Sequence, residues 1–289
     1  EKLENLPEPV TEVVDEKLYF PENTKGKLIE KESGVFAVCG GKYISSDTEN
    51  TNQSDSDMIF YFAEFQFNEN GKIVRTEIEF ENQTSVSNSF TVINSICWDE
   101  KNRQYICATE ENFSDYDTTG FTGSVFSISE DLESTTLLFS KQDSVITGIG
   151  CDKSGIWYSC GNCFDNGNAV HGFIVNSENT EPLLFSTNDA HCKFNQIILE
   201  NNRLVLSGVS CASKNGSDSK PWTLCINKKT NSKMWENFFA GDFNEVYSCM
   251  ANGIGSFLME LYSTQSNQSK IISSDLLGGD TGRELDVLK

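Results

Sequence analysis

Short apolar runs alternate with polar turns along most of the chain. The runs are bounded by Gly, Asn, Asp and Ser, and none continues at the helical period of about 3.6 residues. One example is Val92–Trp98, which is followed by a polar turn at Asp99–Asn102 and then by a second apolar run. This pattern predicts an all-β protein made of short antiparallel strands.

Groups of these strands recur along the sequence. Ser33–Gly41 aligns with Ser154–Asn162, Asn102–Ala108 aligns with Asn202–Gly208, and a fifth copy centres near Leu258. The anchor positions of the first four copies are separated by 68, 53 and 47 residues; they are Cys39, Cys107, Cys160 and Ser207. A repeat of roughly 50 residues is in the range of one propeller blade.

Each copy reads as four strands, with the anchor in the second. The third strand is apolar and often aromatic, as in Ile59–Phe67, and the fourth follows another tight turn, as in Ile73–Phe80. We therefore predict a single β-propeller domain of about five four-stranded blades over residues 21–289, a plan that leaves only short, protected edges. A sixth blade follows if Val10–Phe20 pairs as a strand; otherwise residues 1–20 form a polar tether. A stacked solenoid and two tandem β-sandwiches are the alternative architectures.

One segment resembles the blade repeat of pyrroloquinoline-quinone-type propellers, which runs apolar-Asp-x-x-Thr-Gly-Lys-x-x-Trp. The segment is Leu224–Trp235, with Asn227 in place of the usual Asp and Asn231 in place of Gly. Asp280–Leu285 looks like a second copy that lacks the final Trp. The resemblance implies a propeller fold. It does not imply a quinone cofactor, because many proteins with this repeat only scaffold partners.

The chain is strongly acidic. Its 43 Asp and Glu against 22 Lys and Arg give a net charge of −21, which argues against binding nucleic acid or anionic lipid headgroups, since both need basic surfaces. No apolar run reaches the roughly 18 residues that cross a bilayer. The sequence starts at Glu1 rather than Met, so we expect that a leader was removed. We therefore expect a monomer that is extracellular or anchored at the cell surface, with a cytoplasmic location still open.

The ten cysteines read mainly as small, buried apolar residues. Two pairs flank tight turns, Cys97 with Cys107 and Cys151 with Cys160. We predict that each pair approaches across its hairpin, with or without a disulfide bond.

The connections between second and third strands supply the candidate ligand-binding residues. In a propeller they lie on one face with the connections between blades, and the tight turns lie on the other face. Here they are long, at 45–57, 109–122, 161–171 and 211–221, and we name their side the long-loop face. Loops on a rigid scaffold commonly carry function, although variable solvated loops are the alternative. We predict ligand contacts from Asp55, Asp57, Asp115, Tyr116, Asp117, Phe121, Phe164, Asp165, His171 and Trp222.

Metal and catalytic chemistry have less support in the sequence. With only His171 and His191, and no Gly-x-Ser-x-Gly elbow, a Ser–His–Asp site has few available bases. Calcium could bind the oxygen-rich stretch Asp47–Asp57, but this stretch lacks the spaced Asp pattern and distal Glu of a calcium loop. Cys160 and Cys163 could join His171 in a metal cluster, although a zinc site usually has a second Cys pair.

These observations lead to two main hypotheses. The first is a non-enzymatic binding or scaffold module that engages a protein or glycan through the long-loop face, without a cofactor. The alternative is a glycoside hydrolase with a carboxylate pair at the propeller axis. The first strands carry mostly Ile, Cys, Trp and Gly, with Asp99 and Asp152 at the turns, which departs from that plan. A third hypothesis, an oxidoreductase-like propeller, needs a cofactor-sized pocket at the axis.

Overall fold

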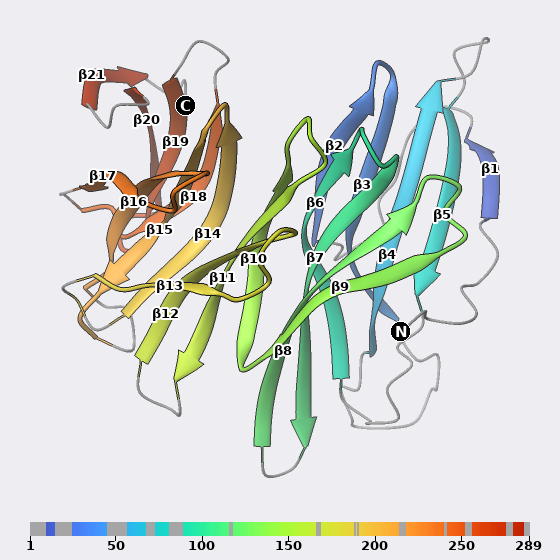
Figure 1. The fold of residues 1–289 in the computed structure, drawn as a ribbon, viewed down its shortest axis with the longest axis horizontal. Helices are drawn as coiled ribbons and strands as arrows, with labels where there is room; N and C mark the ends of the chain where they lie inside the picture. Colours follow the sequence, from blue (N-terminus) through green and yellow to red (C-terminus); the bar gives the residue numbers. More distant parts are fainter. Residues whose placement is uncertain are drawn as a thin grey trace. The chain divides into compact units, whose positions relative to one another are not determined.

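Five antiparallel sheets follow one another along the chain in the computed structural model, which confirms the all-β prediction (Figure 1). The structure describes residues 10–14, 25–44, 57–67, 73–80, 89–115, 118–165, 169–187, 189, 191–213, 218–239, 242–251, 256–275 and 280–285. The described residues contain no helix that could span a membrane. By its internal contacts the chain divides into two compact units, Glu1–Trp157 and Tyr158–Lys289.

Each sheet contains four strands that are consecutive in sequence, and the first sheet has a fifth. Sheet 1 contains β1 (Val10–Val14), β2 (Lys25–Glu32), β3 (Val35–Ile44), β4 (Asp57–Phe67) and β5 (Ile73–Phe80). Sheet 2 contains β6 (Ser89–Asp99), β7 (Gln104–Asp115), β8 (Thr118–Ser129) and β9 (Thr135–Gln142). Sheet 3 contains β10 (Ser144–Cys151), β11 (Trp157–Asp165), β12 (Ala169–Asn176) and β13 (Leu183–Phe185). Sheet 4 contains β14 (His191–Glu200), β15 (Arg203–Cys211), β16 (Lys220–Asn227) and β17 (Lys233–Phe238), and sheet 5 contains β18 (Glu245–Ala251), β19 (Ser256–Ser263), β20 (Gln268–Asp275) and β21 (Asp280–Leu285).

These sheets are the blades of a five-bladed β-propeller, so the predicted plan and blade count are confirmed. The five anchor positions all lie in the second strand of their sheets: β3, β7, β11, β15 and β19. The sixth-blade alternative is wrong, because Val10–Val14 pairs with β5 and joins sheet 1 instead of starting a sheet of its own. Of the segment 1–20, expected as a tether, these five residues are the described part.

The tight turns follow the chemistry of their polar residues. Gly34, Gly155 and Asn201 each have a positive φ in the turn between a first and a second strand, where residues without a bulky side chain are favoured. In the turn between β16 and β17, Asn227 Oδ1 accepts hydrogen bonds from the backbone N–H groups of Lys229 (3.0 Å) and Thr230 (3.2 Å). The quinone-type resemblance therefore marks a real strand-turn-strand unit.

The second segment of that resemblance behaves differently. Asp280–Leu285 forms strand β21, paired with β20, and not a turn. The quinone-type repeat is therefore not confirmed.

Asparagine side chains join neighbouring sheets at a recurring position. Asn94 Nδ2 donates to the carbonyl oxygen of Ile146 (2.8 Å), and Asn195 Nδ2 donates to that of Val246 (3.0 Å). Both asparagines are the extra residue of a β-bulge in the first strand of their sheet. A bulge re-aims a side chain, and here the carboxamide binds the backbone of the next first strand.

Sheets 3 and 4 are joined in a related way through Asn162 in β11. Its Nδ2 donates to the carbonyl oxygen of Phe194 (3.0 Å), and the N–H of Phe194 donates to its Oδ1 (2.6 Å). Both residues are buried. The Phe194 ring packs directly over Gly172, where an added Cβ would lie 2.6 Å from two ring carbons. This junction therefore depends on the carboxamide of Asn162 and on the absence of a side chain at Gly172.

A buried lysine joins sheets 1 and 2. The side chain of Lys31 is 5% exposed, and its Nζ lies 3.0 Å from Glu64, 3.4 Å from Glu130 and 4.5 Å from the centre of the Trp98 ring. The Tyr105 hydroxyl also donates to Glu64. Two carboxylates and an aromatic face compensate the desolvated ammonium group.

All ten cysteines are free thiols. Cys97 lies across from Ile106, and Cys107 lies across from Ile96. This register is offset by one residue from the predicted facing pair, so the two thiols belong to opposite faces of the hairpin.

Candidate functional site

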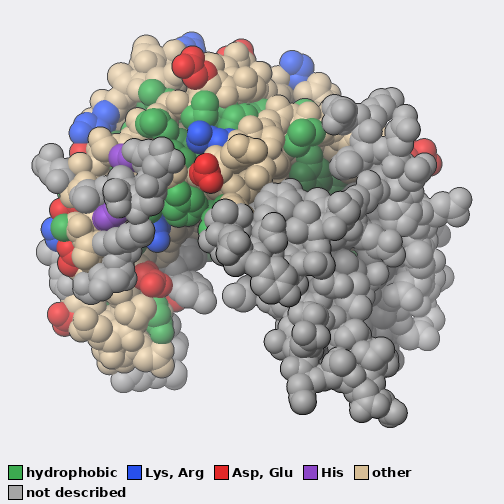
Figure 2. All heavy atoms as spheres, turned by 90° about the horizontal axis from the view of Figure 1, so that it is seen from below, with side chains coloured by type: hydrophobic (Ala, Val, Ile, Leu, Met, Phe, Trp, Pro, Cys, Tyr) green, Lys and Arg blue, Asp and Glu red, His purple; other side chains and the backbone are tan. Residues whose placement is uncertain are grey.

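Two of the four connections predicted to be long are short, because residues 116–117 alone separate β7 from β8 and residues 166–168 alone separate β11 from β12. The best-described part of the long-loop face is the end of sheet 4 and the adjoining end of sheet 3. The connections between β11 and β12, between β15 and β16, and between β13 and β14 all reach this end, because the strands alternate in direction. Figure 2 shows histidine side chains gathered close together on this face, with acidic and basic side chains around them.

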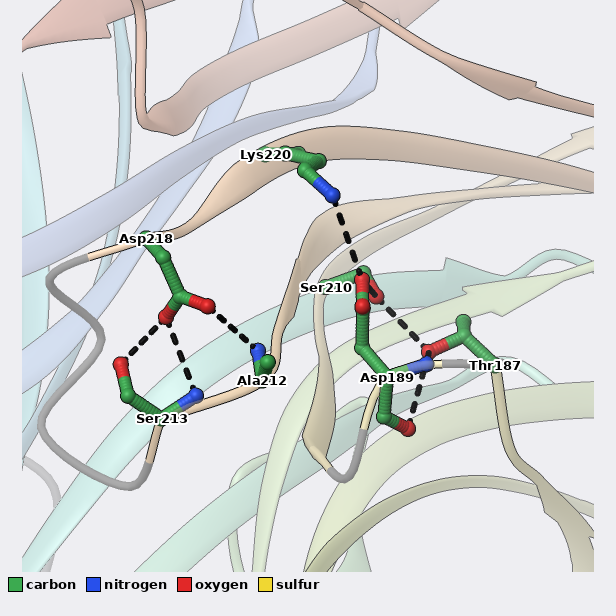
Figure 3. A network of polar contacts seen from close by, with 7 residues as sticks. All are labelled: Thr187, Asp189, Ser210, Ala212, Ser213, Asp218 and Lys220. Atoms are coloured by element: carbon green, nitrogen blue, oxygen red, sulfur yellow. Dashed lines mark hydrogen bonds and ion pairs between the residues drawn. The ribbon is translucent and has the colours of Figure 1, made fainter.

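Asp218 fastens the connection between β15 and β16. Its carboxylate accepts hydrogen bonds from the N–H of Ala212 (2.9 Å), the N–H of Ser213 (3.0 Å) and the Ser213 hydroxyl (Figure 3). The Ser213 hydroxyl, followed by the backbone donors, lowers the pKa of Asp218. The ionised carboxylate thus holds Asp218, just before β16, to Ala212 and Ser213, just after β15.

Asp189 fastens the neighbouring connection, between β13 and β14, to sheet 4. The buried Ser210 hydroxyl donates to Asp189 Oδ2 (2.8 Å), and Lys220 Nζ lies 3.9 Å from the same oxygen (Figure 3). The Thr187 hydroxyl lies 2.7 Å from that of Ser210 and accepts the N–H of Asp189 (3.2 Å). Two adjacent loops are therefore held at one end of the sheet by their own carboxylates.

His191 is the first residue of β14 and connects sheet 4 to sheet 3. It is buried, and its Nδ1 accepts the backbone N–H of Val170 (3.2 Å), the second residue of β12. An acceptor at Nδ1 places the proton of the neutral ring on Nε2. In the register of sheet 4, His191 lies across from Cys211, where the next long connection begins. One imidazole therefore links the starts of two strands that border the long loops.

The thiols at this end are buried and poorly suited to reaction. Cys192 Sγ donates to the carbonyl oxygen of Phe185 (3.1 Å) and accepts the N–H of Gly172 (3.4 Å). Burial raises the pKa of Cys192 and of Cys211. Nucleophilic and redox cysteines need a lowered thiol pKa, so these two act as packing residues.

The cluster of Cys160, Cys163 and His171, which the sequence left open, does not form. Cys163 lies across from His171, whereas Cys160 lies across from Ile174. The two cysteines are three residues apart on one strand, so they point to opposite faces of the sheet. Within the described residues, no group of three potential ligands could hold a metal ion.

Trp222 lies in the core and not at the surface as predicted. It is 1% exposed, stacks on Phe194 at 4.9 Å between ring centres, and donates from Nε1 to Glu236 (2.9 Å). Phe238, across from Trp222 on β17, stacks on its other side at 6.4 Å and is 47% exposed. The aromatic side chain that reaches solvent here is therefore Phe238.

The other predicted residues are placed less completely. Phe121 in β8 and Phe164 in β11 are half-buried, as is His171 in β12. The side chains of Asp57, Asp115 and Asp165, at strand ends, lie outside the described part, as do Asp55, Tyr116 and Asp117 altogether.

The sequence did not predict Asp189 or Ser210 at this end, and it offered His191 only as one of two possible catalytic bases. Ser210 is 21 residues from Asp189, and His191 is 21 residues from Val170, so only folding brings the partners together. A local signal did exist at Ser210, a hydroxyl near the end of the otherwise mostly apolar strand β15.

Four carboxyl groups of the described residues are suited to accepting hydrogen bonds in the ionised form and not to donating protons. Each one whose pKa is shifted has it lowered: Asp99, Glu130, Asp131 and Asp218. A general acid at neutral pH needs the opposite shift.

Comparison by sequence finds no matching family model and no matching curated protein. Among similar solved structures, the GH43 endo-arabinanase from Bacillus licheniformis has a TM-score of 0.42 and 12% identity, over 90% of this chain and 96% of that one. A GH43 β-1,3-galactosidase has a TM-score of 0.47 and 8% identity, over 90% of this chain and 92% of that one. The tricorn protease has a TM-score of 0.36 and 8% identity, over 93% of this chain and 36% of that one. With TM-scores below 0.5 and such low identity, these similarities carry no conclusion about this chain.

Proposed function

We propose that this chain is a non-enzymatic binding module that engages a protein or glycan through the long-loop face. The observation that carries the proposal is the pair of loops that Asp218 and Asp189 hold at the end of sheet 4. A residue already held by hydrogen bonds loses less entropy on binding. The held residues at the ends of these two connections are therefore suited to recognition.

The ligand chemistry follows from charge and exposed side chains. A net charge of −21 favours association with a basic partner. The exposed Phe238 offers a sugar a stacking face, and the paired Lys220 and Asp189 offer hydrogen-bonding groups. The proposal includes an extracellular or surface-anchored location and no cofactor. Calcium bound near Asp47–Asp57 would instead show as a melting temperature that EDTA lowers.

The test compares two aspartates of the same chemistry on opposite ends of the strands. Asp218 lies on the long-loop face, and Asp131 lies in the tight turn between β8 and β9, where it accepts hydrogen bonds from Ser129 and Glu133. Wild type, Asp218→Ala and Asp131→Ala are applied to a glycan array and an array of basic peptides. We expect at least tenfold weaker binding of any ligand by Asp218→Ala, and unchanged binding by Asp131→Ala.

The hydrolase alternative is tested on the same material. Wild-type protein is incubated with polysaccharides, and new reducing ends are measured. Steady release of reducing ends would reject the binding-module proposal in favour of a glycoside hydrolase. Equal loss of binding in both variants would reject the long-loop face as the contact surface.

A further inference from the structure

We propose that Phe238, on the outer strand of sheet 4, is the stacking platform of a subsite for a neutral pyranose sugar, with Lys220 and Asp189 binding the hydroxyl groups of that sugar. The subsite is part of the binding surface proposed above and therefore rests on that function. It narrows the ligand from a protein or a glycan to a glycan.

An aromatic row crosses sheet 4 and ends at Phe238. The register sets Gly208 of β15 between Phe194 and Trp222. Phe238 follows across from Trp222 on the outer strand β17. Since Gly208 has no side chain, the two rings beside it can stack, and their centres lie 4.9 Å apart with 15° between the ring planes. The Phe238 ring continues the stack at 6.4 Å and 16°.

The inner part of this row fixes the orientation of the Phe238 ring. Trp222, on which it stacks, is 1% exposed, and its Nε1 donates to Glu236 Oε1 (2.9 Å). The end of β17 is held to β16, because the N–H of Phe239 donates to the carbonyl oxygen of Pro221 (3.0 Å). A ring that is already held in place loses less entropy when a ligand stacks on it.

Phe238 is exposed although it belongs to this row. It is 47% exposed, and among the side chains that the structure describes it is the only exposed aromatic one. Met234, the other exposed apolar residue of β17, lies near the opposite end of the strand. Aromatic surface in contact with water costs free energy, and a ligand with an apolar face removes this cost when it covers the ring.

The charged pair beside Phe238 suits the hydroxyl groups of a sugar. Lys220 lies two residues before Trp222 on β16, so its side chain shares the face of Trp222 and Phe238. Diagonal positions of this kind are about 7–8 Å apart. Lys220 Nζ lies 3.9 Å from Asp189 Oδ2 (Figure 3). A pyranose presents C–H groups on one ring face and hydroxyl groups at its rim, which match an aromatic ring flanked by a donor and an acceptor.

Charge favours a neutral sugar over an acidic one. Lys220 and Asp189 neutralise each other, and the net charge of −21 repels sugars that carry carboxylate or sulfate groups. Protein-binding sites are marked by large contiguous apolar patches, whereas the face of Phe238 also carries Lys220 and Glu236. A neutral oligosaccharide is therefore the ligand that fits this subsite.

The test measures glycan binding by variants of Phe238 in the full chain. An array of neutral and uronic-acid-containing oligosaccharides identifies a glycan that the wild type binds, and titration calorimetry then gives its Kd for Phe238→Ala, Phe238→Leu and Phe238→Tyr. Met234→Ala, at an exposed apolar position of the same strand, is the control. We expect a Kd about tenfold higher for Phe238→Ala and Phe238→Leu. Phe238→Tyr and Met234→Ala should leave the Kd unchanged, because both keep the aromatic face.

Three results would overturn the subsite. Equal binding by Phe238→Leu and Phe238→Tyr would indicate general apolar contact instead of stacking. Binding of uronic-acid glycans alone would contradict the preference for neutral sugars. Absence of glycan binding up to millimolar concentration would remove the ligand class itself.

Failure of the subsite is separable from failure of the binding function. If the wild type binds basic peptides but no glycan, and Asp218→Ala weakens the peptide binding, the binding module stands and the sugar subsite falls. If the wild type releases reducing ends while Phe238→Ala raises the KM for the polysaccharide about tenfold, the subsite stands and the non-enzymatic function falls.

Discussion

At the scale of single residues, side-chain oxygens decide where strands end and turns begin. Asp99 ends β6 and accepts hydrogen bonds from the N–H of Asn102 (3.1 Å), from Asn102 Nδ2 (2.7 Å) and from Gln104 Nε2 (3.2 Å). Asp152 does the same at the end of β10, accepting from the N–H groups of Ser154 (3.0 Å) and Ile156 (3.1 Å). Asp99 and Asp152, which marked turns in the repeats of the sequence, therefore stabilise those turns through their own side-chain hydrogen bonds.

Asp99 gives a prediction about pH. Burial alone would raise the pKa of Asp99, but the hydrogen bonds from Asn102 and Gln104 outweigh it and lower the pKa. The stability that Asp99 contributes is therefore complete above pH about 4, its unfolded pKa, and is lost as the pH falls through the lower folded value. We expect Asp99→Ala to lower the free energy of unfolding by about 1–2 kcal/mol at pH 7. Urea unfolding between pH 2.5 and 7 measures this; a constant difference down to pH 2.5 would contradict it.

Gly172 gives a prediction about packing. Gly172→Ala places a Cβ 2.6 Å from the ring of Phe194, which is itself stacked on Trp222 and cannot move aside. We expect a loss of about 1–3 kcal/mol in the free energy of unfolding. Gly120→Ala, where nothing lies within 4 Å of the added carbon, serves as the control and should change stability by less than about 0.5 kcal/mol. Equal effects of both substitutions would refute the steric explanation.

At the scale of elements, neighbouring sheets are joined by a few polar side chains as well as by apolar packing. One apolar cluster, which includes Phe62, Tyr105 and Ile128, fills the space between sheets 1 and 2, and a second, which includes Phe257 and Met259, fills that between sheets 4 and 5. The asparagines at the bulges and on β11 add directed bonds to this packing. Directed bonds fix how each sheet is aligned with the next, because apolar contact alone has no preferred direction.

Among these asparagines, Asn162 makes two buried hydrogen bonds to the same residue. Asn162→Ala leaves a buried N–H and a buried carbonyl group of Phe194 without their partner. We expect the free energy of unfolding to fall by about 2–4 kcal/mol. Asn179→Ala removes one exposed bond, to the N–H of Glu181, and should remove less than about 1 kcal/mol. Thermal and urea unfolding compare the two, and similar losses would show that the junction is not specific.

Lys31 gives a second prediction at this scale. Lys31→Met leaves Glu64 without its ammonium partner in a mostly desolvated place, so we expect a loss of about 1–3 kcal/mol. Lys233→Met removes a cation that is 59% exposed from its pair with Glu236 and should change stability by about 0–1 kcal/mol. Urea unfolding at low and high salt measures both changes. A Lys31→Met variant that is more stable than wild type would show that desolvating Lys31 costs more free energy than its ion pairs contribute.

At the scale of the whole molecule, the excess of acidic residues opposes folding. The net charge of −21 concentrates repulsion in the folded state, and salt screens it within a Debye length of about 8 Å at physiological ionic strength. We expect the melting temperature to rise by a few degrees between 20 and 500 mM NaCl. Equimolar steps of a neutral osmolyte are the control for excluded-volume effects. A melting temperature that falls with salt would show that attractive pairs such as Lys31 with Glu64 dominate over the net repulsion.

The pattern of apolar and turn residues along the sequence was sufficient to predict a propeller of four-stranded blades. Alternating apolar residues and Gly, Asn and Asp turns act within a few residues of one another, so the strands and turns of four of the repeats were predictable, and five blades followed from their spacing. The extra strand β1 was harder to place. Its partner β5 is about sixty residues away, and an added edge strand has the same alternating pattern as the start of a new blade.

The sequence by itself determined the all-β class and the repeat of four strands, because these depend on short-range periodicity and turn chemistry. It left five or six blades open, and two of the connections that it predicted to be long, 109–122 and 161–171, consist mostly of strand. Only the tertiary structure decided that Trp222 is a core residue, that Cys160 and Cys163 face apart, and that Asp189 binds Ser210. The physical reason is that burial and hydrogen-bond partners come from strands distant in sequence. An aromatic residue or a carboxylate beside a loop has the same local pattern whether it faces solvent or the next sheet.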